Sequence, residues 1–260
     1  MADSTHEKYL RAYVGGYDLS GDTMSFGPMG VTYEPEAIAC WSDSVKAVRS
    51  QGHPQNSMGS LAGLMTPTAN RLHALYKAGG NTPIITVACG MMAVPAAGDE
   101  TFSGKFLQRD YIVSPALGSG YIPSNLTFES QPNGALVYYQ QPWGVLLHAN
   151  AAATAVNSGT ADHDNGASSS LGGYGVLQVL AGNGTCTFTI EHSAANDDPT
   201  FDATGAIVTF STTDASSPFA EIKEIAPSTT VQRYLRWQIA LGTATTVTFV
   251  LSFHRGAANG

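Results

Sequence analysis

The sequence predicts a mainly β protein, and three observations support this fold class. Short runs rich in β-branched and aromatic residues recur through the chain, and Gly, Pro and Ser turns separate them. Glycine accounts for 28 of the 260 residues. Charged residues make up only 12% of the chain, whereas about 25% is usual for soluble domains. The surface is therefore built largely from small and uncharged polar residues.

The first half of the chain contains several strand-like segments. Residues 11–22 alternate apolar and polar positions before a bend, and residues 31–41 form a second extended run in which Pro35 indicates an edge or a bulge. Further strands are expected at 83–89, 102–113 and 124–131. In the last of these, alternation places Leu126 and Phe128 in the core and leaves one face of the sheet wet.

One helix and one long loop are expected among these strands. Residues 66–79 favour a helix, because Thr66 can cap it, Pro67 suits the first helical position and Gly79 can close its C-terminus. Residues 42–65 show little periodicity, and loops of this length in compact domains are usually functional or disordered. We therefore expect a contact loop over residues 42–65.

The second half is typical of a β-sandwich. A strand opens it at residues 143–148, a segment of small residues follows at 149–173, and six short strands come after that. These six strands are expected at residues 174–180, 185–191, 206–210, 220–225, 234–239 and 245–253.

The chain is long enough for one large domain or two ordinary ones. The turn cluster QPNG at residues 131–134 is a plausible boundary. We expect a first domain over residues 1–134, with a polar N-terminal arm, and a C-terminal β-rich region or domain over residues 135–260.

The charge balance argues against nucleic-acid binding. Twelve Lys and Arg residues face 20 Asp and Glu residues, which gives a formal net charge of −8. Binding by phosphate neutralisation needs a basic face. A surface with so few charges is also poorly protected against self-association. An assembling structural protein is one explanation of this composition, and a secreted β protein is another.

No catalytic, cofactor-binding or metal-binding constellation stands out, and we expect that the protein is not an enzyme. Residues 162–166, DHDNG, resemble the start of a calcium loop, but the twelfth position is Gly173 where such loops carry a glutamate. The three cysteines, Cys40, Cys89 and Cys186, follow no ligand or redox spacing and are interpreted as small buried hydrophobes.

Several segments resemble one known family. The run RAYVGGYDLSGD at residues 11–22 is similar to the opening strand and turn of major tail tube proteins of long-tailed, siphovirus-type bacteriophages, and residues 106–134 resemble their closing hairpin. The pieces DNGAS, GYGVLQV, TIEHS and VQRYLR, at residues 164–168, 173–179, 189–193 and 231–236, look like β-rich extensions of phage tail proteins.

The resemblance implies a tail-tube-type β-sandwich or barrel with one flanking helix, followed by a C-terminal β-sandwich-like region. It implies hexameric rings stacked into a tube whose lumen conducts DNA without binding it specifically. The implied partners are further copies of the chain, a tape measure protein, a tail terminator and distal tail proteins, with no membrane and no cofactor. The implied location is the virion tail, after synthesis in the bacterial cytoplasm.

Candidate site residues follow from this resemblance together with strand alternation. The residues expected to face the lumen are Glu34, Glu36, Asp110, Thr127, Glu129 and Gln131. The residues expected in a loop that contacts other subunits or rings are Asp43, Lys46, Arg49, His53, Asn56 and Met58. Pro35 interrupts one expected lumen strand, and the C-terminal half exceeds a minimal tube subunit.

Two alternatives remain open. The sandwich-like second half also fits another virion β protein, such as a head decoration or tail-tip component. A carbohydrate-binding module or glycan hydrolase is a weaker alternative, based on Trp143, Trp237 and the acidic pair Glu34 and Glu36.

Overall fold

The structure is a computed structural model that describes residues 7–32, 36–38, 47–49, 55–91, 93–115, 122–130, 142–154 and 156–256. Its helical elements are η1 (Glu7–Tyr9), α1 (Leu72–Tyr76) and α2 (Asp198–Thr204). Its strands in the first half are β1 (Leu10–Val14), β2 (Tyr17–Asp18), β3 (Thr23–Phe26), β4 (Met29–Thr32), β5 (Glu36–Ile38), β6 (Ala47–Arg49), β7 (Gln55–Met58), β8 (Ser60–Leu64), β9 (Ile84–Cys89), β10 (Glu100–Val113) and β11 (Pro123–Ser130). Its strands in the second half are β12 (Trp143–Ala153), β13 (His163–Asp164), β14 (Gly173–Gly182), β15 (Thr185–Ser193), β16 (Ala206–Thr209), β17 (Thr213–Asp214), β18 (Phe219–Ile225), β19 (Tyr234–Ala240) and β20 (Val247–Arg255).

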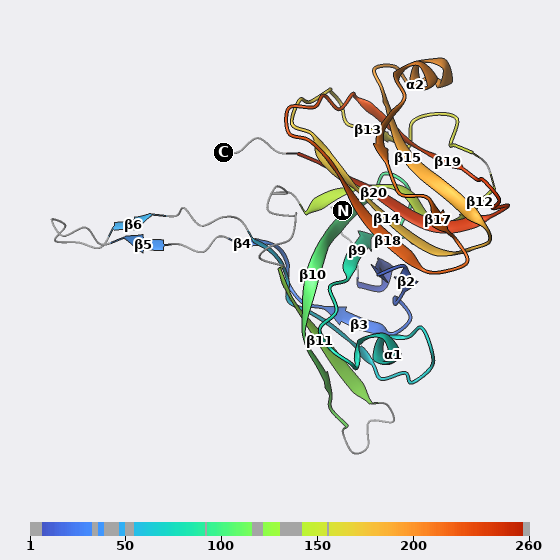
Figure 1. The fold of residues 1–260 in the computed structure, drawn as a ribbon. Coiled ribbons are helices and arrows are strands. Elements are labelled where there is room, and N and C mark those ends of the chain that lie inside the picture. Colours follow the sequence, from blue (N-terminus) through green and yellow to red (C-terminus); the bar gives the residue numbers. More distant parts are fainter. Residues whose placement is uncertain are drawn as a thin grey trace.

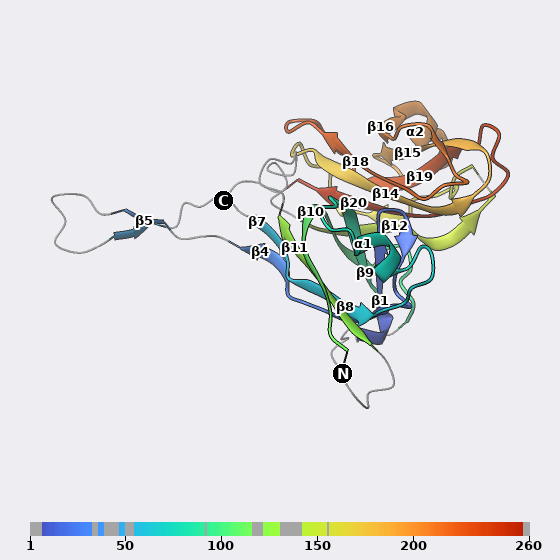
Figure 2. The same cartoon turned by 60° about the horizontal axis from the view of Figure 1, so that its bottom comes forward.

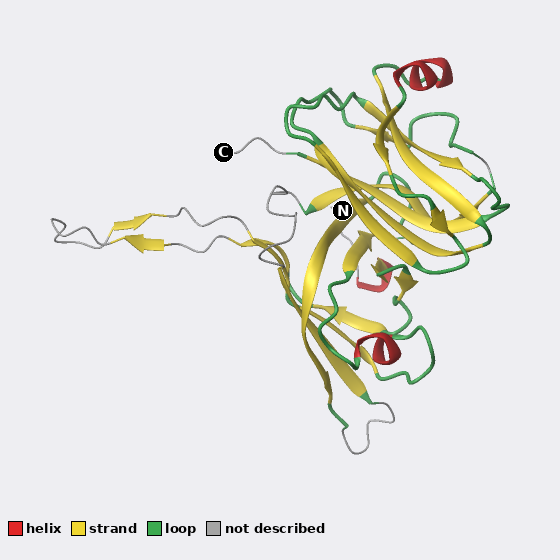
Figure 3. Ribbon diagram, viewed as in Figure 1, coloured by secondary structure: helices red, strands yellow, loops and turns green. Residues whose placement is uncertain are grey.

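The described chain is mainly β, of the β-sandwich class, as the sequence predicts (Figure 3). Its largest sheet has the order β18-β14-β20-β12-β10-β11-β8-β3, and β9, β1 and β2 branch from β10 (Figure 1). A second sheet has the order β13-β19-β15-β16, with β17 beside β15. All the described pairings of these strands are antiparallel, so each sheet can bury one face and expose the other. No helix within the described ranges is long and apolar enough to cross a membrane.

Two apolar cores organise the molecule. In the second half, side chains of β14 and β20 pack against side chains of β15 and β19, with Phe188, Trp237 and Phe249 among the largest. In the first half, Leu72 and Tyr76 of α1 pack against strands of the large sheet. These cores fall on either side of residue 134, while the β10–β12 ladder joins their strands in one sheet. The domain boundary itself stays a prediction.

Strands β14 and β20 are buried on both faces. In β20, Phe249, Leu251 and Phe253 point into the core of the second half, and the alternate residues Val250, Ser252 and His254 point the other way and are also buried. Strand side chains alternate between the two faces of a sheet, so this strand separates two interiors. The second interior lies between β14 and β20 on one side and β9 and β10 on the other, and we call it the seam.

The centre of the seam is polar. Its hydrogen-bonded side chains are Thr86, Ser103, Gln178, Ser252 and His254, all fully buried. The Ser103 hydroxyl donates to Thr86 Oγ1 at 3.2 Å and lies 3.4 Å from Ser252 Oγ, which is 3.1 Å from His254 Nε2. Polar groups without access to water must find partners inside the protein, so this network fixes how the two halves meet. Its burial also keeps the Ser252–His254 pair out of reach of a substrate.

Two glycines permit close approaches at the seam. The Gly16 amide donates to Gln178 Oε1 at 2.7 Å, at a φ of +85° that disfavours other residues. A Cβ on Gly16 would lie 2.4 Å from the Phe219 nitrogen, and a Cβ on Gly144 would lie 2.6 Å from Cγ of the His254 ring. Both positions therefore require a residue without a side chain.

The predicted helix at residues 66–79 is wrong in extent, because α1 spans only Leu72–Tyr76. Asn70 has a left-handed φ of 62°, which interrupts any helix that would begin at Thr66. The carboxylate of Asp22 instead accepts the Leu72 amide at 3.1 Å and lies 3.4 Å from Arg71. A residue fifty positions away in the sequence thus sets the start of this helix.

The predicted loop at residues 42–65 is also partly wrong. Its described part contains β6, β7 and β8, and β8 lies inside the large sheet between β11 and β3. Leu61 is buried and is the register partner of Leu126 and Phe26. The small residues Ser60, Ala62 and Gly63 around it hide the alternation that would have indicated a strand.

In the second half, all six expected short strands are present as β14, β15, β16, β18, β19 and β20. Strand β12 runs further than expected, through Ala153 in the small-residue segment. Helix α2 was not predicted, and it adds a second α-helix where one was expected. The Asp197 side chain caps it by accepting the Thr200 amide at 2.9 Å.

Burial lowers the pKa of His254 to about 3 and so predicts acid sensitivity at the seam. Below pH 6.5 the His254 imidazole is protonated in the unfolded chain but stays neutral in the folded chain. The free energy of unfolding therefore decreases as pH falls from 6.5 toward 3. We expect His254→Gln to remove about 2–4 kcal/mol of the pH-dependent change in unfolding free energy. Urea unfolding at several pH values would measure it.

Burial also lowers the pKa of His148, His163 and His192, so these histidines contribute to the pH dependence of stability as well. The contribution of His254 is therefore the difference in pH dependence between the variant and wild type. A control variant, His73→Gln, replaces a histidine outside the seam. Equal pH slopes for wild type and His254→Gln would contradict the prediction.

Candidate functional site

The structure brings three predicted lumen residues together on the outward face of β10 and β11. Asp110 and Thr127 are register partners, and the Thr127 hydroxyl donates to Asp110 Oδ2 at 3.2 Å. Glu129 is exposed on the same strand as Thr127. Leu126 and Phe128 point into the core, so the predicted alternation of β11 is confirmed. These three residues therefore share one wet face of the sheet.

A β-bulge places an unexpected cation on this face. The register shifts between Gln108 and Asp110, which leaves Arg109 as the extra residue of β10. The Arg109 guanidinium donates to Glu129 at 2.7 Å and lies 3.6 Å from Asp110. Surface ion pairs of this kind contribute little to stability, but this one leaves a single net negative charge among the three groups. Simple alternation contains no signal for a bulge, so the sequence analysis missed Arg109.

The remaining predicted residues separate into three groups. Glu36, Arg49 and Asn56 lie in β5, β6 and β7, where the structure describes the backbone, and Glu36 and Arg49 are register partners. Met58 was expected in a contact loop, but its side chain is buried in the core of the first half, so that expectation is wrong. The other predicted residues, namely Glu34, Asp43, Lys46, His53 and Gln131, lie outside the described residues.

Strands β4 to β7 form an arm. β4 pairs with β7 from Met29↔Met58 to Thr32↔Gln55, and β5 pairs with β6 from Glu36↔Arg49 to Ile38↔Ala47. Each ladder is a two-stranded sheet in the described chain, and the β5–β6 ladder stands away from the other elements (Figures 1 and 2). An isolated two-stranded hairpin is at best marginally stable in water. The β4–β7 ladder is attached to the core of the first half through Met29 and Met58, so only the β5–β6 ladder has the character of a segment that needs a partner surface.

The sheet that carries the wet face has two open edges. In the order β10-β11-β8-β3, no described strand pairs with the outer edge of β3. On the other side, β9 pairs with β10 only as far as Lys105, so residues 109–113 have no described neighbour on that side. Each edge strand carries one exposed apolar side chain: Met24 of β3 is 52% exposed and Ile112 of β10 is 53% exposed.

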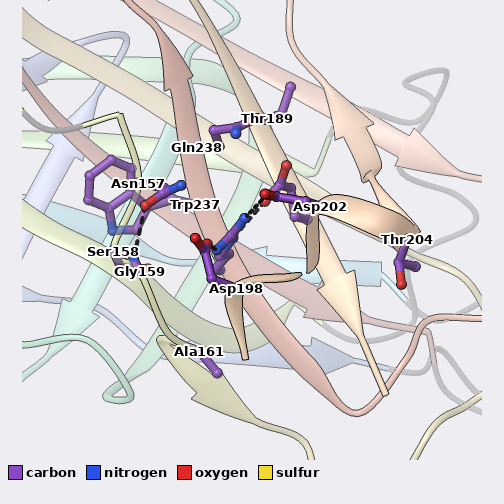
Figure 4. Close-up of polar contacts among 12 residues, drawn as sticks. Asn157, Ser158, Gly159, Ala161, Thr189, Asp198, Asp202, Thr204, Trp237 and Gln238 are labelled. Atoms are coloured by element: carbon purple, nitrogen blue, oxygen red, sulfur yellow. Dashed lines mark hydrogen bonds and ion pairs between the residues drawn. The ribbon is translucent and has the colours of Figure 1, made fainter. Parts of the chain in front are cut away.

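A charged cluster fastens α2 to the second sheet. Arg236 of β19 is fully buried, and its guanidinium donates to Glu191 of β15 at 2.6 Å and to Asp202 of α2 at 2.8 Å. Asp198 accepts a third hydrogen bond from it (Figure 4). Burial acts to lower the pKa of Arg236, but the hydrogen bonds and charges of Asp198 and Glu191 outweigh that effect and raise it. The guanidinium also lies 4.5 Å from the centre of the Phe201 ring.

Asp162 lies near Arg236 and is hydrogen-bonded to β19, the strand that carries Arg236. Its Oδ2 accepts the Trp237 amide at 3.0 Å and the Ser158 hydroxyl at 2.8 Å. Burial raises the pKa of Asp162 to about 6, in spite of these hydrogen bonds and the nearby charge of Arg236. The cluster holds backbone and side chains in place, and it leaves no carboxylate pair facing a cavity.

The other motifs weighed in the sequence have structural positions. Asp164, in the calcium-like run, makes two hydrogen bonds of 2.7 Å with Arg233. Within the described residues, no group of three or more His, Cys, Asp or Glu side chains could hold a metal ion. Trp237 is 7% exposed and belongs to the core, whereas Trp143 is 37% exposed. Cys186 is buried and Cys89 half-buried, and Cys40 lies outside the described residues.

Comparison with known proteins gives little further information. No protein-family model and no curated protein sequence matches the chain. Among solved structures, one similar chain comes from "Structure of the phage p2 baseplate in its activated conformation with Sr". The TM-score is 0.31 at 10% identity, over 95% of this chain and 98% of that chain. A likeness this low carries no conclusion about the function of this chain.

We expect Arg236→Gln to lower the free energy of unfolding by about 3–5 kcal/mol, because it leaves the buried Glu191 without its partner. The double variant Arg236→Met/Glu191→Leu should show a smaller decrease in the free energy of unfolding, since it removes both buried charges. Urea denaturation measures both values. Arg109→Gln is the matched control on an exposed pair and should change stability by less than about 1 kcal/mol. A loss as small for Arg236→Gln as for this control would contradict the prediction.

Proposed function

We propose that this chain is a structural protein of a bacteriophage virion and, more specifically, the major tail tube subunit. In this proposal, copies form hexameric rings that stack into a tube, and the lumen conducts DNA during ejection. The observation that carries the proposal is the sheet β10-β11-β8-β3, which has one wet face and two open edges. The resemblance of residues 11–22 and 106–134 to tail tube proteins gives this geometry its interpretation.

Open edges become useful when copies of the chain complete one another. An unpaired strand presents N–H and C=O groups that another chain can bind, which is normally an aggregation hazard. If β3 of one copy pairs with the distal part of β10 in the next, the contact is head-to-tail, and such contacts close into a ring when the rotation permits. The exposed Met24 and Ile112 would then be buried at the same contact.

The wet face supports a lumen that does not hold DNA. The described charges on it are Asp110 and Glu129 with Arg109 between them, and Lys105, which lies two residues before Leu107, the register partner of Glu129. Two negative and two positive groups balance, so the described face carries no excess of basic charge. Protein binding to duplex DNA depends on neutralising its phosphates with basic side chains. A face without an excess of basic side chains does not neutralise phosphates, so the duplex can pass without being held.

The arm formed by β4 to β7 is assigned to contacts with a neighbouring ring. Its outer ladder, β5–β6, lacks a supporting layer in the described chain, and the predicted contact segment, residues 42–65, overlaps the arm. In this proposal, the tape measure protein, the tail terminator and distal tail proteins are further partners in the virion. The role is structural and not enzymatic.

We expect the purified wild-type protein to form rings or tubes that negative-stain electron microscopy shows. Met24→Lys and Ile112→Lys should abolish them, because a lysine at an open edge disfavours strand pairing. Both side chains are exposed, so the monomer should keep its fold, which circular dichroism would check.

Val156→Lys is the matched control, since Val156 is an exposed apolar residue outside the two edges. It should assemble like wild type. A wild-type protein that stays monomeric at high concentration and at all salt concentrations would contradict the proposal. If the purified protein coats phage capsids and does not form hollow cylinders, the result would favour a head decoration protein.

Charge reversal tests the lumen separately. The variant Asp110→Lys/Glu129→Lys places two further cations beside Arg109, and its tubes should retain duplex DNA that wild-type tubes release. Co-sedimentation of DNA with the tubes measures retention, which should fall as salt rises. The control Lys223→Glu/Glu221→Lys exchanges a pair of opposite charges outside this face and should not retain DNA. If wild-type and charge-reversed tubes retain equal amounts of DNA, the assignment of Asp110 and Glu129 to the lumen is wrong.

A further inference from the structure

A small pocket lies at the rim of the C-terminal sandwich, far in the sequence from the edges and the arm used above. Its volume is about 340 Å³, and it opens between the start of β12, the end of β20 and the turn after β13. Its apolar lining includes Val145 and Phe253, and its polar lining includes Trp143, His163, Asn165 and Arg255. A volume near the lower end of the range for ligand pockets suits one sugar residue and no large ligand.

Arg255 is a half-buried cation without a carboxylate partner among the described residues. Its Nη1 and Nη2 donate to the backbone carbonyls of Asn165 and Ala167, at 3.5 and 2.5 Å. Its Nε is buried and has no hydrogen-bond partner. The nearby Asp164 does not neutralise it, because both Asp164 oxygens are engaged by Arg233. Each Nη nitrogen carries two hydrogens and the two carbonyls use one from each, so the Nη groups keep two donors for a carboxylate or a phosphate in the pocket.

The neighbouring polar groups add donors and no charge of the opposite sign. Asn165 Nδ2 is buried without a partner, so it has a hydrogen to donate. Burial lowers the pKa of His163, which keeps its ring neutral at pH 7 and able to accept or donate one hydrogen bond. The polar lining thus matches a ligand that offers an anionic group together with hydroxyls.

The apolar side of the pocket is aromatic. Trp143 remains 37% exposed, although its neighbour Phe102 meets it edge-on with ring centres 5.3 Å apart. An exposed indole combines a flat apolar face with an N–H donor, which suits the mixed surface of a sugar ring. Trp237, the other tryptophan considered for glycan binding, is buried in the core and takes no part.

We propose that this pocket binds an anionic monosaccharide unit, with its carboxylate or phosphate at Arg255 and Asn165 and its ring against Trp143. The shared chemistry is one anionic group attached to a hydroxyl-rich ring, whether the ring carries a uronate or a phosphate ester. The site does not depend on ring assembly, so it can be tested whether or not the chain forms tubes.

Titration calorimetry of the full chain with glucuronate, glucose 6-phosphate, glucose and acetate tests the site. We expect one or both anionic sugars to bind at least about tenfold more tightly than glucose and acetate, since hydrogen bonds to a charged group are stronger than neutral ones. The stronger of the two anionic sugars identifies the source of the charge. Equal binding of glucose and both anionic sugars would overturn the proposal, as would acetate binding as tightly as the anionic sugars.

Variants locate the site. Arg255→Gln should reduce anionic-sugar affinity about tenfold or more, toward that of glucose, while Arg255→Lys should retain part of it because the charge remains. Trp143→Ala should weaken anionic and neutral sugars together. Arg11→Gln is the matched control, because Arg11 also donates to backbone carbonyls and does not line this pocket, and it should bind like wild type. If Arg255 only holds the turn at residues 165–167, Arg255→Gln will lower the melting temperature without changing a wild-type preference for anionic sugars, and the assignment fails.

Discussion

The double burial of β14 and β20 is the constraint on which the arrangement of the molecule depends. One face of these strands supplies the apolar core of the second half, and the other supplies the seam with β9 and β10. An apolar contact tolerates small slips, whereas a network of buried hydroxyl, amide and imidazole groups is satisfied in one arrangement only. The chain from Gly16 through Gln178, Thr86 and Ser103 to Ser252 therefore sets the orientation of the two halves.

A fixed orientation matters for a subunit that is proposed to form rings. Ring closure requires that the two edges of each copy meet the next copy at a repeated angle. Both edges belong to the sheet of the first half, and that sheet continues through β10 into β12 and β20. The sandwich of the second half thus supports the sheet that carries the edges. Arg236 in turn stabilises the second sheet, because it joins β19 to β15 and to α2. The same rigidity would position the pocket at Trp143 and Arg255 identically on every copy.

Much of the fold could be predicted because alternation in β11 and the spacing of β-rich runs are local signals. Leu126 and Phe128 reveal the buried face of β11 without any knowledge of its neighbours. The features that the sequence did not predict depend on residues distant in the chain. Helix α1 starts where Asp22 accepts an amide from fifty residues away, and Arg236 gathers carboxylates 34 to 45 residues distant. Arg109 became a site residue through a bulge, which depends on the partner strand as much as on β10.

The distribution of arginines links the architecture to the proposed pocket. In a chain with only 12 basic residues, Arg71, Arg109, Arg233 and Arg236 each lie within 4 Å of a carboxylate. Arg11 and Arg255 meet only backbone carbonyls among the described groups. Of these two, Arg255 has a buried Nε without a partner and lies in a pocket with an exposed tryptophan. Four of the six arginines whose side chains the structure describes thus have a carboxylate partner, and in the proposed site an anion from outside the chain would supply one to Arg255.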